Sequence, residues 1–238
     1  YIYPIYSLMK YKNLFFDLDD TIWAFSRNAR DTFEEVYLKH ALDRYFDSFE
    51  HYYTLYQKRN TELWIEYGEG KVTKEELNRQ RFLYPLQAVG VNDEELAKRY
   101  SEDFFAIIPT KSGLMPHAKE VLEYLAPKYN LYILSNGFRE LQSRKMRSAG
   151  VDGYFKKVIL SEDLGVLKPW PEIFNFALSA TQSELRESLM IGDSWEADIV
   201  GARGVGMHQA FYNVTKRTDF PFLPTYHIHS LKELTDLL

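Results

Sequence analysis

Residues 13–21, NLFFDLDDT, place one acid directly after an apolar run and a second acid two residues later. The run 13–18 predicts a buried strand, with Asp17 and Asp19 where that strand ends. Two carboxylates that lie close together repel each other, so a folded protein needs a reason to keep them there. One reason is a bound divalent cation, and an oxygen-rich pair suits Mg²⁺. The alternative is a polar turn in which Asp19 or Asp20 caps the next helix.

The composition narrows the class of protein. A chain of 238 residues with 45% hydrophobic and 26% charged residues is typical of one large globular domain, or of a domain with a sizeable insertion. The net charge of −5 argues against a broad nucleic-acid-binding surface, so we expect no nucleic-acid polymer as partner. Because the chain has no cysteine, disulfides, zinc–thiolate sites and thiol nucleophiles are excluded.

The amino-terminal residues bear on location. They are apolar but carry no basic segment, and no run in the chain approaches the roughly 20 apolar residues of a membrane-spanning helix. We therefore expect no membrane partner and a cytoplasmic location. Residues 1–11 are expected to form an amino-terminal extension.

Short apolar runs recur along the rest of the chain, and helical patterns separate most of them. The runs lie at 130–135, 157–160, 189–192, 208–211 and 226–228. Alternating strands and helices predict an α/β fold with a parallel sheet covered by helices on both faces. In such sheets ligands bind beyond the carboxyl ends of the strands, where Asp17, Ser135 and Asp193 are expected.

The stretch from about residue 24 to residue 106 interrupts this alternation. It is aromatic and charged, it contains no convincing buried strand, and its apolar residues recur at helical spacing, as at Phe46, Phe49, Tyr53 and Tyr56. Patterns that favour helix capping begin at Thr73 and Asn92, and outside this stretch at Thr181. We predict a helical insertion whose aromatic residues form its own core.

Two further short motifs carry polar side chains: one follows a second predicted strand, and the other is a lysine that precedes a proline. Ser135 and Asn136 leave the run 130–135, where a hydroxyl group and free backbone amides can hold a phosphate oxygen. The alternative is an ordinary Asn-Gly turn. Lys168, before Pro169, could neutralise both a nucleophilic carboxylate and a phosphate. The alternative is that Lys168 is an ordinary surface lysine, because a Lys-Pro dipeptide alone carries little information.

A last motif follows the run 189–192. Gly192 allows a sharp turn, Asp193 then projects from the strand end, and Asp198 returns near the first turn of the next helix. This arrangement suits metal coordination with a supporting carboxylate. Helix capping by Asp193 or Ser194 is the alternative.

Together, Asp17 to Thr21, Ser135-Asn136, Lys168-Pro169 and residues 192–198 resemble the four motifs of the haloacid dehalogenase-like (HAD) hydrolase superfamily. The resemblance implies a Rossmann-like core at 12–22 and 107–238, with an all-helical cap of the C1 subclass at 23–106. The opening FFDLDDT and the long aromatic insertion are most similar to YjjG-like pyrimidine 5′-nucleotidases.

The resemblance also implies roles for the acids. Asp17 is the expected nucleophile, which attacks phosphorus and forms an aspartyl-phosphate. Asp19 is expected to protonate the leaving alcohol and then to activate water. The expected Mg²⁺ ligands are the Asp17 carboxylate, the Asp19 backbone carbonyl and Asp193.

The remaining motif residues are implied to hold the phosphoryl group. Ser135, the Asn136 amide and Lys168 are expected to contact its oxygens, and Lys168 is also counted as catalytic. Asp198 is expected to orient Lys168 or a metal-bound water from outside the metal site.

The expected function is a Mg²⁺-dependent phosphatase for a small phosphorylated metabolite, with a nucleoside 5′-monophosphate as substrate. The alternatives are a phosphatase for another small phosphate ester, an L-2-haloacid dehalogenase and a catalytically silent HAD-like binding protein. The dehalogenases need only the nucleophilic aspartate, so Asp19 favours phosphoryl transfer. Nothing in the sequence indicates an oligomeric state.

Overall fold

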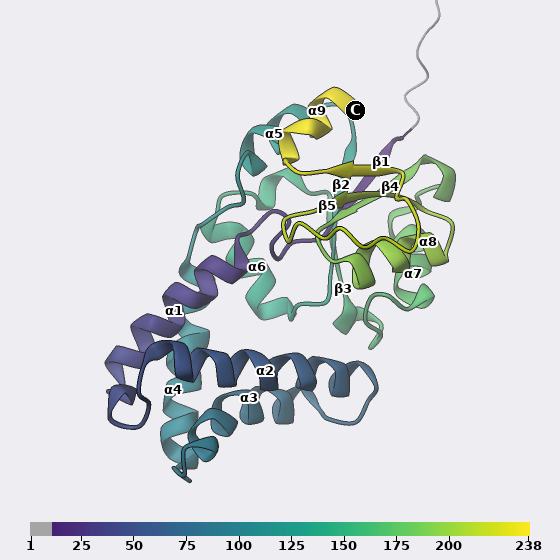
Figure 1. Ribbon diagram of the computed structural model, residues 1–238. Helices are drawn as coiled ribbons and strands as arrows, with labels where there is room; N and C mark the ends of the chain where they lie inside the picture. Colours follow the sequence, from purple (N-terminus) through teal and green to yellow (C-terminus); the bar gives the residue numbers. More distant parts are fainter. Residues whose placement is uncertain (1–10) are drawn as a thin grey trace, which may run out of the picture. The chain divides into compact units, whose positions relative to one another are not determined.

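The computed structural model describes residues 11–238, which form two compact units (Figure 1). Unit 1 contains the chain up to Phe25 together with Ser112–Leu238, and unit 2 contains Ser26–Lys111. Most of the expected amino-terminal extension, residues 1–10, lies outside the described residues. No helix among the described residues is both long enough and apolar enough to cross a membrane.

Unit 1 is built on a six-stranded sheet in the order β3-β2-β1-β4-β5-β6, and all neighbouring strands are parallel. The predicted α/β fold is confirmed, and every predicted strand is present with bounds within two residues. The strands are β1 Asn13–Phe16, β2 Asn130–Ser135, β3 Lys157–Leu160, β4 Ser188–Gly192, β5 His208–Tyr212 and β6 Tyr226–Ile228.

Helices cover the sheet because its strands are apolar on both faces. Alternate residues such as Phe15, Tyr132 and Met190 share a core with Phe174 and Ala202 from two of the helices. The residues between them on these strands are also buried. The helices of unit 1 are α5 Ala118–Leu125, α6 Arg139–Ser148, α7 Pro171–Thr181, a π-helical segment Trp195–Val200, α8 Gly201–Gly204 and α9 Leu234–Leu237.

The strand register brings the motif residues to one edge of the sheet. Phe16 of β1 pairs with Ile133 of β2 on one side and with Ile191 of β4 on the other. The three central strands therefore end side by side, and the residues that follow them leave the sheet at the same edge.

All regular secondary structure in unit 2 is helical, and the unit has an aromatic core, as predicted. The ring centroid of Phe33 lies 4.2 Å from those of Tyr56 and Phe104. Tyr52, Phe82 and Tyr100 are fully buried around them. The helices are α1 Phe25–Lys39, which starts at the end of unit 1, α2 Phe49–Gly68, α3 Lys74–Ala88 and α4 Glu94–Ile107.

One of the three predicted helix caps is confirmed and two are wrong. Thr73 caps α3, and its side chain accepts the Glu76 N–H at 3.2 Å. For α4 the cap is Asp93 and not Asn92, because the Asp93 carboxylate accepts the Leu96 N–H. Thr181 does not start a helix: it ends α7, where its hydroxyl group donates to the Ala177 carbonyl.

Candidate active site

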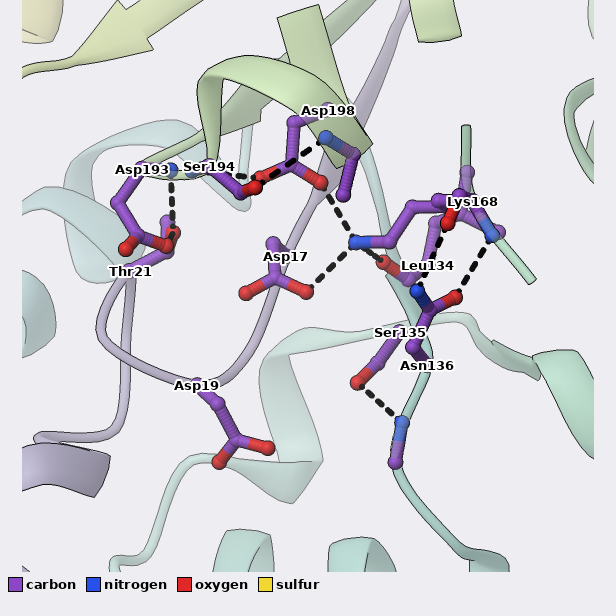
Figure 2. A network of polar contacts seen from close by, with 12 residues as sticks. Asp17, Asp19, Thr21, Leu134, Ser135, Asn136, Lys168, Asp193, Ser194 and Asp198 are labelled. Carbon is purple, nitrogen blue, oxygen red and sulfur yellow. Dashed lines mark hydrogen bonds and ion pairs between the residues drawn. The ribbon is translucent and has the colours of Figure 1, made fainter. Parts of the chain in front are cut away.

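Asp17 and Lys168 form a buried ion pair at the centre of the strand ends. Lys168 Nζ donates to Asp17 Oδ1 at 2.7 Å, to Asp198 Oδ1 at 2.6 Å and to the Leu134 carbonyl at 2.7 Å. Lys168 is only 4% exposed, and these bonds occupy the three hydrogens of its ammonium group. Figure 2 shows the Asp17 carboxylate between Lys168 and the Thr21–Asp193 pair.

Asp198 is one of the three groups that hold the Lys168 ammonium group in place. It is completely buried in the π-helical segment, and its second oxygen, Oδ2, accepts the Ser194 N–H at 3.1 Å. The space for this carboxylate exists because residue 192 is glycine: a Cβ there would lie 2.1 Å from Asp198 Oδ2. The predicted proximity of Asp198 to Lys168 is therefore a direct contact.

Asp193 is held by Thr21, a residue that the sequence-based reasoning gave no role. Thr21 Oγ1 donates to Asp193 Oδ1 at 3.0 Å and accepts the Asp193 N–H at 3.0 Å. Ser194, and not Asp193, caps the helical segment that follows, by accepting the Ala197 N–H. Asp193 is thus free of a capping role.

The cluster has the charge and the oxygen atoms that a divalent cation requires. Asp17, Asp193 and Asp198 offer carboxylate oxygens that all lie within 4.8 Å of one another. With Lys168, these groups carry a net charge of −2 when all are ionised, which one divalent cation would balance. The bonds to Lys168 and Thr21 use one oxygen each of Asp17 and Asp193, so Oδ2 of each remains for a cation.

The titration of the cluster reflects the same repulsion. Burial raises the pKa of Asp17 to about 7; Lys168 acts in the opposite direction, and Asp198 and Asp19 add to the increase. Burial, followed by the charges of Asp17 and Asp198, raises the pKa of Asp193 to about 8. Burial alone would lower the pKa of Lys168, but Asp17 and Asp198 outweigh it and raise that pKa. Without a cation, the site favours protonated carboxyl groups.

Ser135 has a hydroxyl hydrogen available for a ligand. Its Oγ accepts the Gly137 N–H at 3.1 Å and Gln142 Nε2 at 2.8 Å, which leaves its own O–H to donate. The Asn136 side chain instead clamps the backbone of Lys168, accepting from its N–H at 2.8 Å and donating to its carbonyl at 3.0 Å. This clamp uses one of the two Nδ2 hydrogens, and the backbone amide of Asn136 remains the expected phosphate donor.

The Asp19 carboxylate does not share the site of Asp17. It lies apart from the three clustered carboxylates (Figure 2) and accepts hydrogen bonds from two side chains of α6. Lys145 Nζ lies 2.9 Å and 3.2 Å from its two oxygens, and Gln142 Nε2 lies 2.9 Å from Oδ2. The metal role proposed for Asp19 therefore concerns its backbone carbonyl.

Sequence-based reasoning missed Thr21, Gln142 and Lys145 as site residues. Of these three, only Gln142 and Lys145 could have been recognised from the sequence, because they share one helical face with the apolar residues Phe138 and Met146. Polar residues on the buried stripe of a helix indicate a specific partner. No local pattern marks Thr21, whose partner Asp193 lies 172 residues away.

The site places acids and a buried lysine beyond the carboxyl ends of a parallel sheet, where ligands bind in α/β proteins. The model of the haloacid dehalogenase-like hydrolase family matches residues 11–206, so the chain belongs to this family.

Three relatives resemble the chain along nearly its full length. The magnesium-bound crystal structure of the HAD-hydrolase YfnB from Bacillus subtilis is 28% identical, covers 96% of this chain and 98% of its own, and has a TM-score of 0.85. Pyrimidine 5′-nucleotidase YjjG of Escherichia coli is 29% identical over 97% of this chain and 99% of its own. Pyrimidine 5′-nucleotidase PynA of Streptococcus pneumoniae is 31% identical over 97% and 96%.

Proposed function

We propose that the chain is a Mg²⁺-dependent phosphatase that hydrolyses a small phosphate ester, with a nucleoside 5′-monophosphate as the substrate. The observation that carries this proposal is the separation of two neighbouring acids. Asp17 contacts Lys168, whereas Asp19 contacts Lys145 and Gln142. Two carboxylates with different partners at one strand end suit a nucleophile and an acid/base.

In the first step, an Asp17 oxygen attacks phosphorus and the bond from phosphorus to the leaving oxygen breaks. Asp19 passes its proton to that oxygen, so an alcohol leaves and Asp17 carries the phosphoryl group. Lys168 keeps the Asp17 carboxylate in one orientation. The Ser135 hydroxyl and the Asn136 N–H are proposed to donate to phosphoryl oxygens.

In the second step, water attacks phosphorus and Asp19, now ionised, takes a proton from the water. The bond between phosphorus and Asp17 breaks, the Asp17 carboxylate is restored, and inorganic phosphate leaves. Because Lys168 uses its three hydrogens within the protein, any contact it makes to phosphate replaces or shares one of these bonds.

Asp17, Asp193 and the Asp19 backbone carbonyl are the proposed Mg²⁺ ligands. A bound Mg²⁺ would supply positive charge beside the transferring phosphoryl group. The net negative charge of the carboxylate cluster and its raised pKa values support this assignment. The crystal structure of the relative YfnB contains magnesium.

The names of the relatives are the basis for proposing a nucleotide substrate, and the residues of the site are the basis for proposing a phosphate ester. Two relatives are named as pyrimidine 5′-nucleotidases. Unit 2 is proposed to be the C1-type cap that selects the substrate. Phe33 and Tyr52 are fully buried in its aromatic core, so these two rings are not available to stack on a base.

The test is phosphate release from a panel of nucleoside monophosphates and sugar phosphates, with Mg²⁺ and with EDTA. The wild-type chain should release phosphate only with the cation, and Asp17→Asn should lower the rate at least ~10³-fold. Asp152→Asn is the matched control, because Asp152 is exposed on unit 1. Full activity of Asp17→Asn would refute the assignment of Asp17 as the nucleophile. EDTA-insensitive halide release without phosphate release would instead indicate a dehalogenase.

A further inference from the structure

Helix α6 buries two polar side chains that both reach Asp19. Gln142 is completely buried, and Lys145 is 4% exposed. They lie three residues apart, so they project from the same face of the helix. Elsewhere this helix is rich in exposed charged residues, as at Arg144 and Arg147. Two buried polar groups on such a helix need specific partners.

Lys145 is confined to one position. Its ammonium group lies 4.7 Å from the ring centroid of Trp23 and 5.1 Å from that of Phe25, and it pairs with Asp19. The aromatic faces and the ion pair together restrict the lysine side chain, whose free form has many rotamers. A fixed ammonium group in turn restricts the carboxylate that it contacts.

Gln142 connects Asp19 to Ser135. Its Nε2 donates to Asp19 Oδ2 at 2.9 Å and to Ser135 Oγ at 2.8 Å. Its Oε1 is buried and has no partner among the described residues. An unsatisfied buried acceptor destabilises a fold, and this offsets part of the stability that the two hydrogen bonds of Nε2 contribute. The side chain fits only because residue 137 is glycine: a Cβ there would lie 2.1 Å from Gln142 Nε2.

We propose that Gln142 and Lys145 are positioning residues that aim the Asp19 carboxyl group at the leaving oxygen of the substrate. Lys145 fixes the carboxyl group, and Gln142 sets its place relative to Ser135, which holds the phosphoryl group. The inference rests on the proposed phosphatase function. It follows because a general acid acts only within hydrogen-bond reach of the atom it protonates.

The experiment compares two phosphate esters that differ in their need for an acid. An alkyl phosphate releases a strongly basic alkoxide, which needs the Asp19 proton as the bond to phosphorus breaks. p-Nitrophenyl phosphate releases a stabilised phenolate, which needs this proton much less. The readout is kcat/KM, because it covers the steps up to the first phosphoryl transfer to Asp17.

Lys145→Met and Gln142→Met remove the contacts to Asp19 and keep much of the side-chain volume. Each should lower kcat/KM for the alkyl phosphate ~100-fold and for p-nitrophenyl phosphate less than ~10-fold. Gln142→Met should change the unfolding midpoint little, because the loss of two hydrogen bonds from Nε2 is offset by the removal of an unpaired buried acceptor. Lys145→Arg, which keeps the charge, should recover most of the alkyl phosphatase activity. Arg147→Met on the exposed side of α6 is the control.

Gly137→Ala tests the same contact without changing either positioning residue. The added methyl group should displace Gln142 and reproduce the selective loss. In a Gln142→Ala background the space is empty, so adding Gly137→Ala should cost nothing further, and the two changes should be strongly non-additive.

The outcomes separate this inference from the proposed function. Equal losses on both esters in the Met variants, or additive effects of Gly137→Ala and Gln142→Ala, would refute the positioning role and leave the phosphatase proposal intact. A wild-type chain that releases phosphate from neither ester nor from the wider panel would refute both.

Discussion

Asp17 and Asp19 lie two residues apart, yet their side chains have different neighbours. Asp17 contacts a lysine 151 positions further along the chain, and Asp19 contacts one 126 positions further along. β1 ends at Phe16, so the chain leaves the sheet at Asp17 and the two carboxylates diverge. Each acid can then take a separate chemical role.

Gly192 is as important to the site as the acids beside it. Its Cβ position is occupied by the Asp198 carboxylate, so Gly192→Ala should displace Asp198 and release one bond of Lys168. We expect a loss of ~1–3 kcal/mol in unfolding free energy, as for other overpacked sites, together with a large loss of phosphatase activity.

Urea denaturation and phosphate release measure these two effects. Gly153→Ala is the matched control, since a Cβ at Gly153 meets no atom within 4 Å. If Gly192→Ala behaved like Gly153→Ala in both assays, the role of Gly192 in placing Asp198 would be wrong.

Among the secondary-structure elements, helix α4 shows how local patterns leave the start of a helix undecided. Asn92 and Asp93 are both good capping residues, and both lie just before the helix. Leu96, Tyr100 and Phe104 are buried on one face of α4, and the same face would be buried with either cap. In the structure the Asp93 carboxylate accepts the Leu96 N–H, so Asp93 is the cap.

Asp93→Ala should destabilise the protein by about 1 kcal/mol, because the Leu96 N–H loses its acceptor. Asn92→Ala should cost much less, since Asn92 does not cap α4. The unfolding free energies of the two variants in urea measure the difference. Equal losses would contradict the assigned cap.

For the folded chain as a whole, the carboxylate cluster links stability to pH and to Mg²⁺. The pKa values of Asp17 and Asp193 rise from an ordinary 3.8 to about 7 and about 8. At pH values between the ordinary pKa and the raised pKa of each group, the folded state holds more protons than the unfolded state. The free energy of unfolding therefore falls as the pH rises through this range. Metal-free protein should therefore lose stability from about pH 4 to about pH 8 through these two groups.

Mg²⁺ should reverse this loss, because it binds the ionised carboxylates. The increase in melting temperature on adding Mg²⁺ should be larger at pH 8 than at pH 5, and Asp193→Asn should reduce it. Thermal unfolding in EDTA and in Mg²⁺ across this pH range is the measurement. An increase that is independent of pH would argue against Asp17 and Asp193 as the ligands.

Local patterns in the sequence were sufficient to predict the α/β fold, the strands and the strand ends at which Asp17, Ser135 and Asp193 lie. The reason is that short apolar runs in this chain coincide with strands buried on both faces. The same patterns misplaced the caps at Asn92 and Thr181: the neighbouring Asp93 caps α4, and Thr181 lies at the end of α7.

The pairing of side chains across the site depends on the tertiary structure. Parallel register places β1, β2 and β4 side by side, and this brings Lys168 to Asp17, Thr21 to Asp193, and Lys145 to Asp19. These partners are 126 to 172 residues apart, so no local pattern specifies them. The acids could be found in the sequence, but what distinguishes one from another is the neighbours that folding gives them.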